Sequence, residues 1–261
     1  EEINEEWISD KTRYACDGLK NQRLDSPYMK KNTKFEKISW KEAYNKIFEK
    51  ISETPSEKIA ALTGDMTNME TMFALKEFFE KTIRSENLES RVDNLYVNTS
   101  EKENYLFNSS IEGVEDSDLI ILIGANPRFE ATMLNSRIRK AYLNNNTDIF
   151  SLGDVGDLNY SYEVLDNSTK TIKDILNHTH KISEKIHNSK KPIFLIGQSA
   201  LKLKSSPFLF EELKKYLIKN NKINHNWNAL NILSNDASTV GSNFLNIFSS
   251  NDGTNKTIYK I

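Results

Sequence analysis

The amino-acid sequence predicts an α/β fold in which layers of parallel strands are flanked by helices. Short apolar runs of strand length alternate with segments whose apolar residues recur every three or four positions, the pattern of parallel strands joined by helices. Three of these runs end in a glycine, as buried strands do before a turn. A hydrophobic content of 38% over 261 residues provides enough apolar material for a core.

The first element is a helix that begins near residue 40. Ser39 and Glu42 have capping-box spacing, in which the serine hydroxyl and the glutamate side chain satisfy free backbone N–H groups. The apolar positions that follow fit one helix face. They are Trp40, Ala43, Tyr44, Ile47, Phe48 and Ile51.

A strand and a second helix come next. Residues 58–64 (KIAALTG) have the composition of a buried strand that ends in a turn glycine. Thr67 and Glu70 repeat the capping-box spacing and so predict a helix start. Its apolar side is expected to contain Met69, Met72, Phe73, Phe79 and Ile83.

The remaining strands and helices alternate. Residues 118–124 (DLIILIG), 148–152 and 191–197 (KPIFLIG) are expected to be strands. A helix with Leu134, Ile138, Ala141 and Tyr142 facing inward follows the first of them. Residues 171–187 carry apolar residues at helical spacing, and Leu209, Leu213, Tyr216 and Leu217 mark a last helix.

Composition divides the chain into three parts. Residues 1–37 are polar and irregular and are expected to form an N-terminal arm packed on a surface. Residues 38–235 form the α/β domain. Residues 236–261 are rich in Ser and Asn, which predicts a loosely ordered or partner-dependent tail.

Charge and cysteine content exclude several classes of function. A formal net charge of −2 gives no electrostatic basis for binding nucleic acid. The apolar runs are far shorter than the roughly 20 residues that cross a bilayer, so no direct membrane insertion is expected. The single cysteine, Cys16, rules out a disulfide within the chain and a cluster held by four cysteines. Its surroundings predict an unreactive thiol.

The strongest candidate for a binding site is the Gly124–Ala125–Asn126–Pro127 turn. It follows a strand at the edge where ligands of α/β sheets bind, and a helix N-terminus there could hold phosphate. Alternatively, it is an ordinary strand-to-helix turn in which proline begins the helix. No G-x-G-x-x-G fingerprint or P-loop occurs in the sequence.

The histidines and a basic cluster have weaker claims. His178 and His180 lie two residues apart, and two such positions do not share a helix face, so a metal site is not expected there. Arg137, Arg139 and Lys140 could meet a phosphate or an acidic partner, although a solvated helix face is the default interpretation.

Two stretches resemble a known family. The run Ile3–Asn4–Glu5–Glu6–Trp7–Ile8–Ser9–Asp10–Lys11–Thr12–Arg13, continued by Tyr14, residues 17–20, Arg23 and Pro27, resembles the large iron–sulfur subunit of NADH:quinone oxidoreductase, respiratory complex I. The segment 124–131 (GANPRFEA), followed by residues 135–140, resembles the same family, whose C-terminal part is similar to molybdopterin oxidoreductases. Residues 227–233 (WNALNIL) add a further likeness.

The resemblance implies a non-catalytic structural subunit. It assigns no catalytic residue, no metal ligand and no cofactor to this chain, and it makes Gly124–Pro127 a vestigial pterin-site turn. Electrons would pass through iron–sulfur clusters and FMN on partner chains. The cysteine-rich half of the subunit is not in this sequence, which suggests a split gene whose cluster-bearing product docks on the arm. The expected partner-binding residues are Trp7, Asp10, Arg13, Arg23, Arg137 and Arg139.

The resemblance also predicts other partners and a location. Further peripheral-arm subunits should contact the chain, on the matrix side of the mitochondrial inner membrane or, alternatively, on the cytoplasmic face of a bacterial membrane. One competing hypothesis is a working molybdopterin oxidoreductase. However, residues 93–115 contain no cysteine, and Ser100, Ser109 and Ser110 lie in no recognisable ligand motif. Another is a nucleotide-binding module built on residues 191–200 (KPIFLIGQSA).

Overall fold

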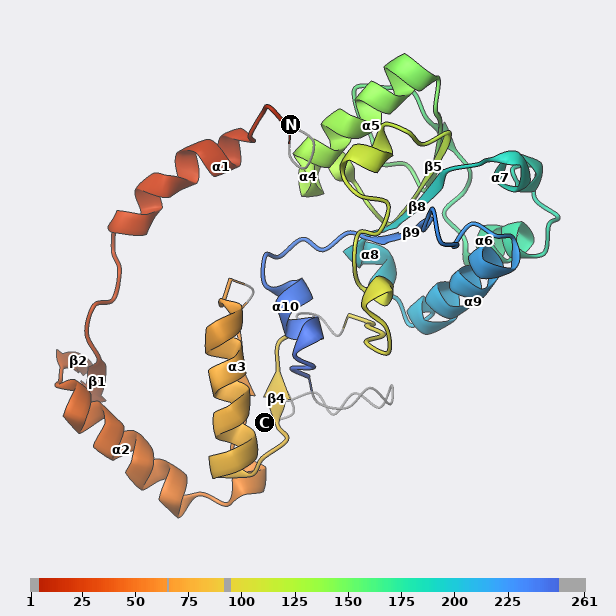
Figure 1. Cartoon of the computed structure of the whole chain (residues 1–261). Coiled ribbons are helices and arrows are strands. Elements are labelled where there is room, and N and C mark those ends of the chain that lie inside the picture. The colour runs from red at the N-terminus through yellow and green to blue at the C-terminus, as the bar shows by residue number, and fades with distance from the viewer. Residues whose placement is uncertain (1–4, 65, 92–94, 249–261) are drawn as a thin grey trace.

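The computed structural model of the chain describes residues 5–64, 66–91 and 95–248 (Figure 1). Its main sheet has five parallel strands in the order β7-β6-β5-β8-β9. They span Glu163–Val164 (β7), Asp148–Leu152 (β6), Leu119–Ile123 (β5), Pro192–Ile196 (β8) and Leu230–Ile232 (β9). The predicted α/β class with a parallel sheet is confirmed.

Both faces of this sheet are buried. Ile121 and Ile123 of β5 contribute to one core, whereas Ile120 and Leu122 contribute to the core on the opposite face. The first core is covered by α6 (Thr169–Leu176), α7 (Ser183–Asn188), α8 (Gln198–Leu201) and α9 (Ser206–Lys219), and the second by α5 (Thr132–Asn145). Two covered faces explain why the strand sequences are continuously apolar rather than alternating.

A third, smaller core lies outside the sheet. It is formed by Met72, Phe79, Ile83, Leu88 and Ile247. The elements around it are α2 (Trp40–Glu53), β3 (Ala61–Leu62), α3 (Met69–Phe78), the π-helical turn η3 (Phe79–Ile83), β4 (Leu88–Glu89) and α10 (Thr239–Phe244). β3 and β4 form a parallel sheet of two short strands.

The N-terminal elements form an exposed arm, which the red and orange ribbon of Figure 1 traces around the outside. They are α1 (Asp10–Tyr14), η1 (Ala15–Lys20), β1 (Tyr28–Lys31) and β2 (Lys34–Lys37), and none of them contains a buried residue. The remaining short helices are η2 (Ser56–Lys58), η4 (Lys102–Asn104), η5 (Glu112–Val114) and α4 (Pro127–Glu130). Within the described ranges no helix is long and apolar enough to cross a membrane.

Several predicted elements are confirmed. The strands expected at 118–124, 148–152 and 191–197 are β5, β6 and β8. The first capping box begins α2, where the Ser39 hydroxyl accepts a hydrogen bond from the Glu42 backbone N–H at 3.2 Å.

The prediction for residues 58–64 was wrong in its extent. Only Ala61 and Leu62 form a strand, and Leu62 is 53% exposed, because the sheet that they belong to has only one other strand. The cap of the next helix also differs. The Asn68 side chain accepts from the Thr71 N–H and caps α3, whereas the Thr67 hydroxyl accepts from the Gly64 N–H.

Residues 171–187 do not form one continuous helix. α6 ends at Leu176 and α7 starts at Ser183. His178 between them has a left-handed backbone, with a φ of 59°, which no residue of an α-helix adopts. The backbone N–H groups of Thr179 and His180 donate to the Asp174 carbonyl, and these bonds complete the turn.

The beginning of the predicted tail is packed rather than loosely ordered. α10 lies within it, and Ile247 is fully buried in the third core. The prediction went wrong because the polar composition concealed two apolar residues, Leu245 and Ile247, that pack in this core. Residues 249–261 of the predicted tail lie outside the described residues, and the boundaries at 37 and 235 stay predictions.

Candidate functional site

The predicted Gly124–Pro127 turn lies at the carboxyl edge of the main sheet, directly after β5. Gly124 has a φ of +59°, a left-handed conformation that glycine adopts without strain. Ala125 is buried, and Pro127 is the first residue of α4, as expected for proline at a helix start. The sequence therefore located the turn and its local structure correctly.

The turn packs tightly against the turn that follows β8. A Cβ added to Gly197 would lie 2.2 Å from the Gly124 carbonyl oxygen, and one added to Gly124 would lie 2.6 Å from the Ala200 backbone nitrogen. The Ser199 hydroxyl also donates to the Gly124 carbonyl at 2.5 Å. Two glycines thus allow the backbones of neighbouring strand ends to approach closely.

A carboxylate of the chain occupies the N-terminus of α4. The Glu130 side chain accepts a hydrogen bond from the Asn126 backbone N–H at 2.7 Å. The Asn126 amide in turn donates to the Val155 carbonyl at 2.9 Å. A phosphate at this turn would need the same N–H group and would face the negative charge of Glu130.

A second carboxylate lies just before helix α6, which also begins at this edge. The Asp166 carboxylate accepts from the Asn167 backbone N–H at 2.7 Å and from the hydroxyls of Ser168 and Thr171 at 3.2 Å. These bonds, the backbone bond first, lower the pKa of Asp166 below its ordinary value. The Ser168 hydroxyl itself accepts from the Thr171 N–H and caps α6.

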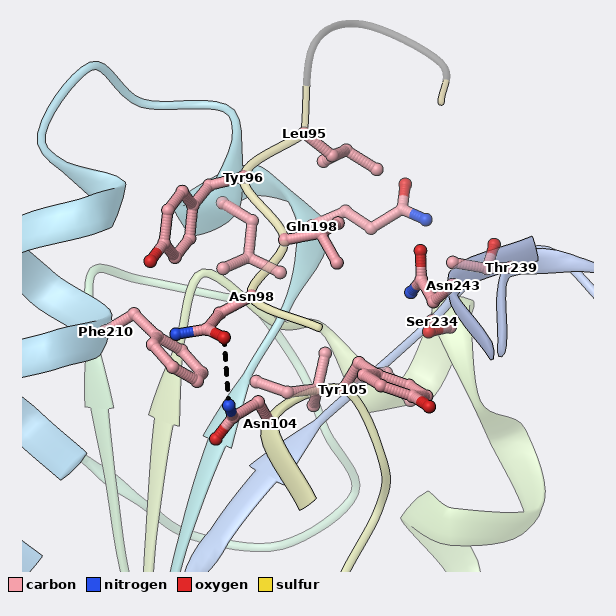
Figure 2. A pocket seen from close by; sticks show the side chains of 14 residues that line it. Leu95, Tyr96, Asn98, Asn104, Tyr105, Gln198, Phe210, Ser234, Thr239 and Asn243 are labelled. Atoms are coloured by element: carbon pink, nitrogen blue, oxygen red, sulfur yellow. Dashed lines mark hydrogen bonds between the residues drawn. The ribbon is translucent and has the colours of Figure 1, made fainter. Parts of the chain in front are cut away.

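Two cavities at this edge are too small for a pterin dinucleotide. The cavity beside Gly124 has a volume of about 130 Å³ and a mainly apolar lining that includes Ile172, Leu203 and Phe208. A second cavity, between α8, α9 and α10, has a volume of about 30 Å³ (Figure 2). Sites for drug-sized ligands usually measure about 300–1,000 Å³, and a single water fills about 30 Å³.

Four amide side chains are among the mostly apolar residues that line the smaller cavity. Asn98 and Asn104 are joined across it by a 3.1 Å hydrogen bond, and Gln198 and Asn243 extend toward it from α8 and α10 (Figure 2). The Oδ1 atom of Asn243 is buried without a protein partner. A cavity of this size is too small for a cofactor.

A wider groove of about 730 Å³ separates α1 from α4 and α5. Its walls are mostly apolar and include Ile8, Phe107, Phe129 and Leu233, with the Glu130 carboxylate on one side. The lining contains one cation, Lys11, as well as the Glu130 carboxylate, so it has no net positive charge to attract phosphate. With the Asn126 N–H already bound to Glu130, the residues of this edge do not fit the phosphate groups of a pterin dinucleotide.

Metal-ligating groups are not gathered anywhere in the described part of the chain, where no three His, Cys, Asp or Glu side chains are placed to share an ion. Ser109 donates to the Asn228 carbonyl and Ser100 to the Asn98 side chain, while Ser110 accepts from the Gly113 N–H. His178 stacks on Tyr216 with ring centroids 5.2 Å apart. Cys16 is exposed on the arm.

The basic cluster on α5 is divided between two environments. Arg139 is exposed, whereas the Arg137 side chain is only 7% exposed and forms ion pairs with Glu5 at 3.1 Å and Glu115 at 2.5 Å. Lys140 pairs with Glu5 at 2.7 Å. For Arg137 the default interpretation of a solvated helix face was therefore wrong, because acidic residues of the same chain surround it.

The other predicted partner-binding residues lie on the exposed arm. Trp7 is 65% exposed, and Arg23 is exposed between η1 and β1. Asp10 and Arg13 form an exposed ion pair at 3.6 Å on α1. The structure does not bring these residues together with Arg139, and their binding to a partner stays a prediction.

The sequence did not indicate the structural roles of three carboxylates: Glu5, Glu115 and Glu130. Glu130 could have been suspected, because it follows Asn126 by one helical turn and acidic residues favour helix N-termini. Glu5 and Glu115 gave no local signal, since their partners lie on a helix far away in the sequence.

Comparison with known proteins places these features in a family. The family described as molybdopterin oxidoreductase matches residues 23–260. A second family, described as the 4Fe-4S domain of NADH-ubiquinone oxidoreductase NDSU1/NuoG-like proteins, matches residues 1–17. The NADH-ubiquinone oxidoreductase 75 kDa subunit of Reclinomonas americana is 38% identical over 256 residues, which are 93% of this chain and 37% of that protein.

Two further relatives agree. A subunit of the NADH-quinone oxidoreductase of Rickettsia prowazekii is 39% identical over 241 residues, covering 92% of this chain and 36% of the relative. The mitochondrial NADH-ubiquinone oxidoreductase 78 kDa subunit of Candida albicans is 38% identical over 251 residues, which cover 93% of this chain and 34% of that subunit. This chain thus spans a little over a third of the length of the relatives that it matches.

Proposed function

The chain belongs to the molybdopterin oxidoreductase family, in the form found in the large iron–sulfur subunit of complex I, and from this we propose that it is a non-catalytic structural part of the peripheral arm of that complex. The observation that carries the proposal is the occupancy of the carboxyl edge by the carboxylates of the chain. Glu130 accepts from the N-cap residue of α4, and Asp166 accepts from the residue before the N-cap of α6, so both carboxylates lie where a bound anion would otherwise be held.

The chemistry of electron transfer supports the same role. An electron carrier needs a bound metal, cluster or organic cofactor, and the described residues contain no group of three or more His, Cys, Asp or Glu side chains that could hold a metal ion. In this proposal, iron–sulfur clusters and FMN on partner chains carry electrons from NADH to quinone. This chain provides a surface that keeps those partners in place.

The N-terminal arm suggests how the chain meets its cluster-bearing partner. Residues 1–17 match the 4Fe-4S domain, and Glu5 within that match is held by Arg137 and Lys140 of the α/β domain. The arm would therefore fix the cluster-bearing part of the subunit relative to the sheet. We propose that other peripheral-arm subunits also contact the chain, on the matrix side of the mitochondrial inner membrane or on the cytoplasmic face of a bacterial membrane.

One competing function has a specific observation in its favour. The chain retains the Gly124–Pro127 turn of a family named for its molybdopterin cofactor. A working molybdopterin oxidoreductase would contain molybdenum and pterin in proportion to protein. The proposal of a structural role predicts neither.

The test begins with native-gel separation of solubilised respiratory membranes, followed by mass spectrometry of the band with NADH dehydrogenase activity. The chain is expected in that band, in equal amount to the cluster-bearing part of the subunit, with no molybdenum and no pterin. A variant such as Ser199→Ala should change the amount of assembled complex but not the activity per assembled complex. Molybdenum in equal amount to the chain, or the chain outside that band, would overturn the proposal.

A further inference from the structure

Helix α2 carries a large apolar face that nothing in the described part of the chain covers. This α2 face consists of Trp40, Tyr44, Ile47 and Phe48, whose exposed fractions are 58%, 61%, 54% and 73%. The helix contains no buried residue along its 14 residues. Trp40 and Tyr44 also contact each other, with ring centroids 5.7 Å apart. Contiguous exposed apolar surface of this kind usually marks an interaction site.

The same stripe continues into a core at its other end. Ile51, one turn beyond Ile47, packs against the third core together with Ile59 and Ala61. Ile51 therefore places the C-terminal end of the stripe beside the core of the unit built on β3 and β4. The exposed end extends beyond that small core.

The sheet of this unit has an open edge on the β3 side. The backbone N–H groups of Ala61 and Thr63 both donate toward β4, to the carbonyls of Asn87 and Glu89 at 2.9 and 3.0 Å. Since backbone groups alternate in direction along a strand, the N–H and C=O of Leu62 point to the opposite edge. Among the described residues no strand pairs there, and the Leu62 side chain is 53% exposed.

A sheet of two short strands is too small to stabilise a domain layer, and native proteins usually protect an open edge by pairing or covering it. β3 presents neither a charged side chain nor a proline at this edge. An added strand would pair with Leu62 and would lengthen the sheet. Its apolar side chains would then have a surface to pack against, the α2 face.

From these two features we propose that an apolar strand from another region of the same subunit adds to the β3 edge and is covered by the α2 face. The binding chemistry is strand addition, in which backbone hydrogen bonds provide affinity and alternate side chains enter an apolar surface. The source of the strand rests on the proposed function. Relatives at 38–39% identity extend over almost three times the matched length, and about 63% of the Reclinomonas americana subunit lies outside the match.

The test places a photo-crosslinking amino acid at one position at a time in the chain within assembled respiratory membranes. Phe48 probes the α2 face and Leu62 probes the open edge. Glu49, on the opposite side of α2 and exposed, is the matched control. After irradiation, mass spectrometry identifies the crosslinked peptide in the band that contains the complex.

Crosslinks from Phe48 and Leu62 to one apolar peptide of the same subunit, with none from Glu49, would support the proposal. Crosslinks from Phe48 to a different subunit or to a second copy of this chain would overturn it, as would yields no higher than those of Glu49. In these cases the chain still migrates with the complex, so the proposed function survives. A chain absent from the complex would contradict the proposed function and this inference together.

Discussion

Arg137 on helix α5 forms an ion pair with Glu5 of the N-terminal arm, with 3.1 Å between Nε and Oε2. Both side chains are buried, at 7% and 2% exposure, although they come from distant parts of the sequence. Glu115 and Lys140 complete a group of two anions and two cations. Because burial limits solvent screening of the Arg137–Glu5 pair, this pair orients the arm more firmly than a surface ion pair does, whereas Glu115 and Lys140 are partly exposed.

Replacement of Arg137 by Met is expected to destabilise the chain. The change leaves the Glu5 and Glu115 carboxylates close together with only Lys140 to neutralise them. We expect a loss of up to about 3 kcal/mol in the free energy of unfolding, at the low end of the range for a broken buried ion pair, because Lys140 remains. Denaturant unfolding of the full chain measures this loss in the free energy of unfolding. Arg139→Met, on the exposed side of the same helix, should change stability by less than about 0.5 kcal/mol.

Docking of the arm should depend on pH in acid. The hydrogen bond from Lys140 is the main cause that lowers the pKa of Glu5 below its ordinary value of 4.5, aided by the Glu6 N–H and the charge of Arg137. A carboxyl group whose pKa is lower in the folded state stabilises that state above the unfolded pKa and loses this contribution as pH falls through the folded value. The stabilisation should therefore be complete at neutral pH and decline below about pH 4.5.

Limited proteolysis of the arm as a function of pH checks this expectation. In the native chain, cleavage within residues 5–20 should accelerate as the pH falls below about 4.5, the ordinary pKa of a glutamate. In Glu5→Gln, cleavage should already be fast at neutral pH and should vary less with pH. Equal pH profiles for the two proteins would show that Glu5 does not control the docking of the arm.

Gly197→Ala should destabilise the chain through a steric clash. The new methyl group would lie 2.2 Å from the Gly124 carbonyl oxygen and 2.7 Å from the Ala125 Cα, both backbone atoms that cannot rotate away. Overpacking of this kind costs about 1–3 kcal/mol, and we expect a lower melting temperature. Gly18→Ala is the control, because a Cβ at Gly18 has no atom within 4 Å. An unchanged melting temperature in Gly197→Ala would contradict the close packing of the two turns.

Lys222→Met tests a buried cation that holds the segment just before β8 in place. The Lys222 ammonium group donates to the carbonyls of His187 and Ser189, and burial lowers its pKa. Methionine keeps the length of the side chain but leaves both carbonyls without this donor. We expect a loss of about 1–3 kcal/mol in unfolding free energy. Lys219→Met, exposed at the end of α9, should have little effect, and equal losses in the two variants would refute the role of Lys222.

The sequence predicted the elements whose signals are local. β5, β6 and β8 are continuous apolar runs because both faces of the sheet are buried, and the Ser39 cap needs only its own helix. The amphipathic pattern of α2 predicted a helix but could not show that the apolar face lacks a cover. The break at His178 was missed because a single left-handed residue interrupts a run with helical spacing on both sides.

The candidate site was predictable in position but not in chemistry. Gly124 and Pro127 mark the turn, because glycine and proline restrict backbone conformation in characteristic ways. The bond from Asn126 to Glu130 depends on a side-chain conformation that a sequence pattern does not specify. Asn231 gave still less warning. This fully buried asparagine accepts from the N–H groups of Asn108 and Ser109 and so joins two segments that looked unrelated.

The occupied helix N-terminus has an evolutionary consequence. Substitution of Glu130 alone would free one N–H group but leave Gly124 pressed against Ala200, with a neighbouring cavity of about 130 Å³. Enlarging that cavity alone would remove core contacts while the carboxylate still repelled an anion. Neither step improves affinity without the other, and each costs stability. Under the proposed structural role, a return to anion binding would need both changes together, so selection on single mutations would not produce it.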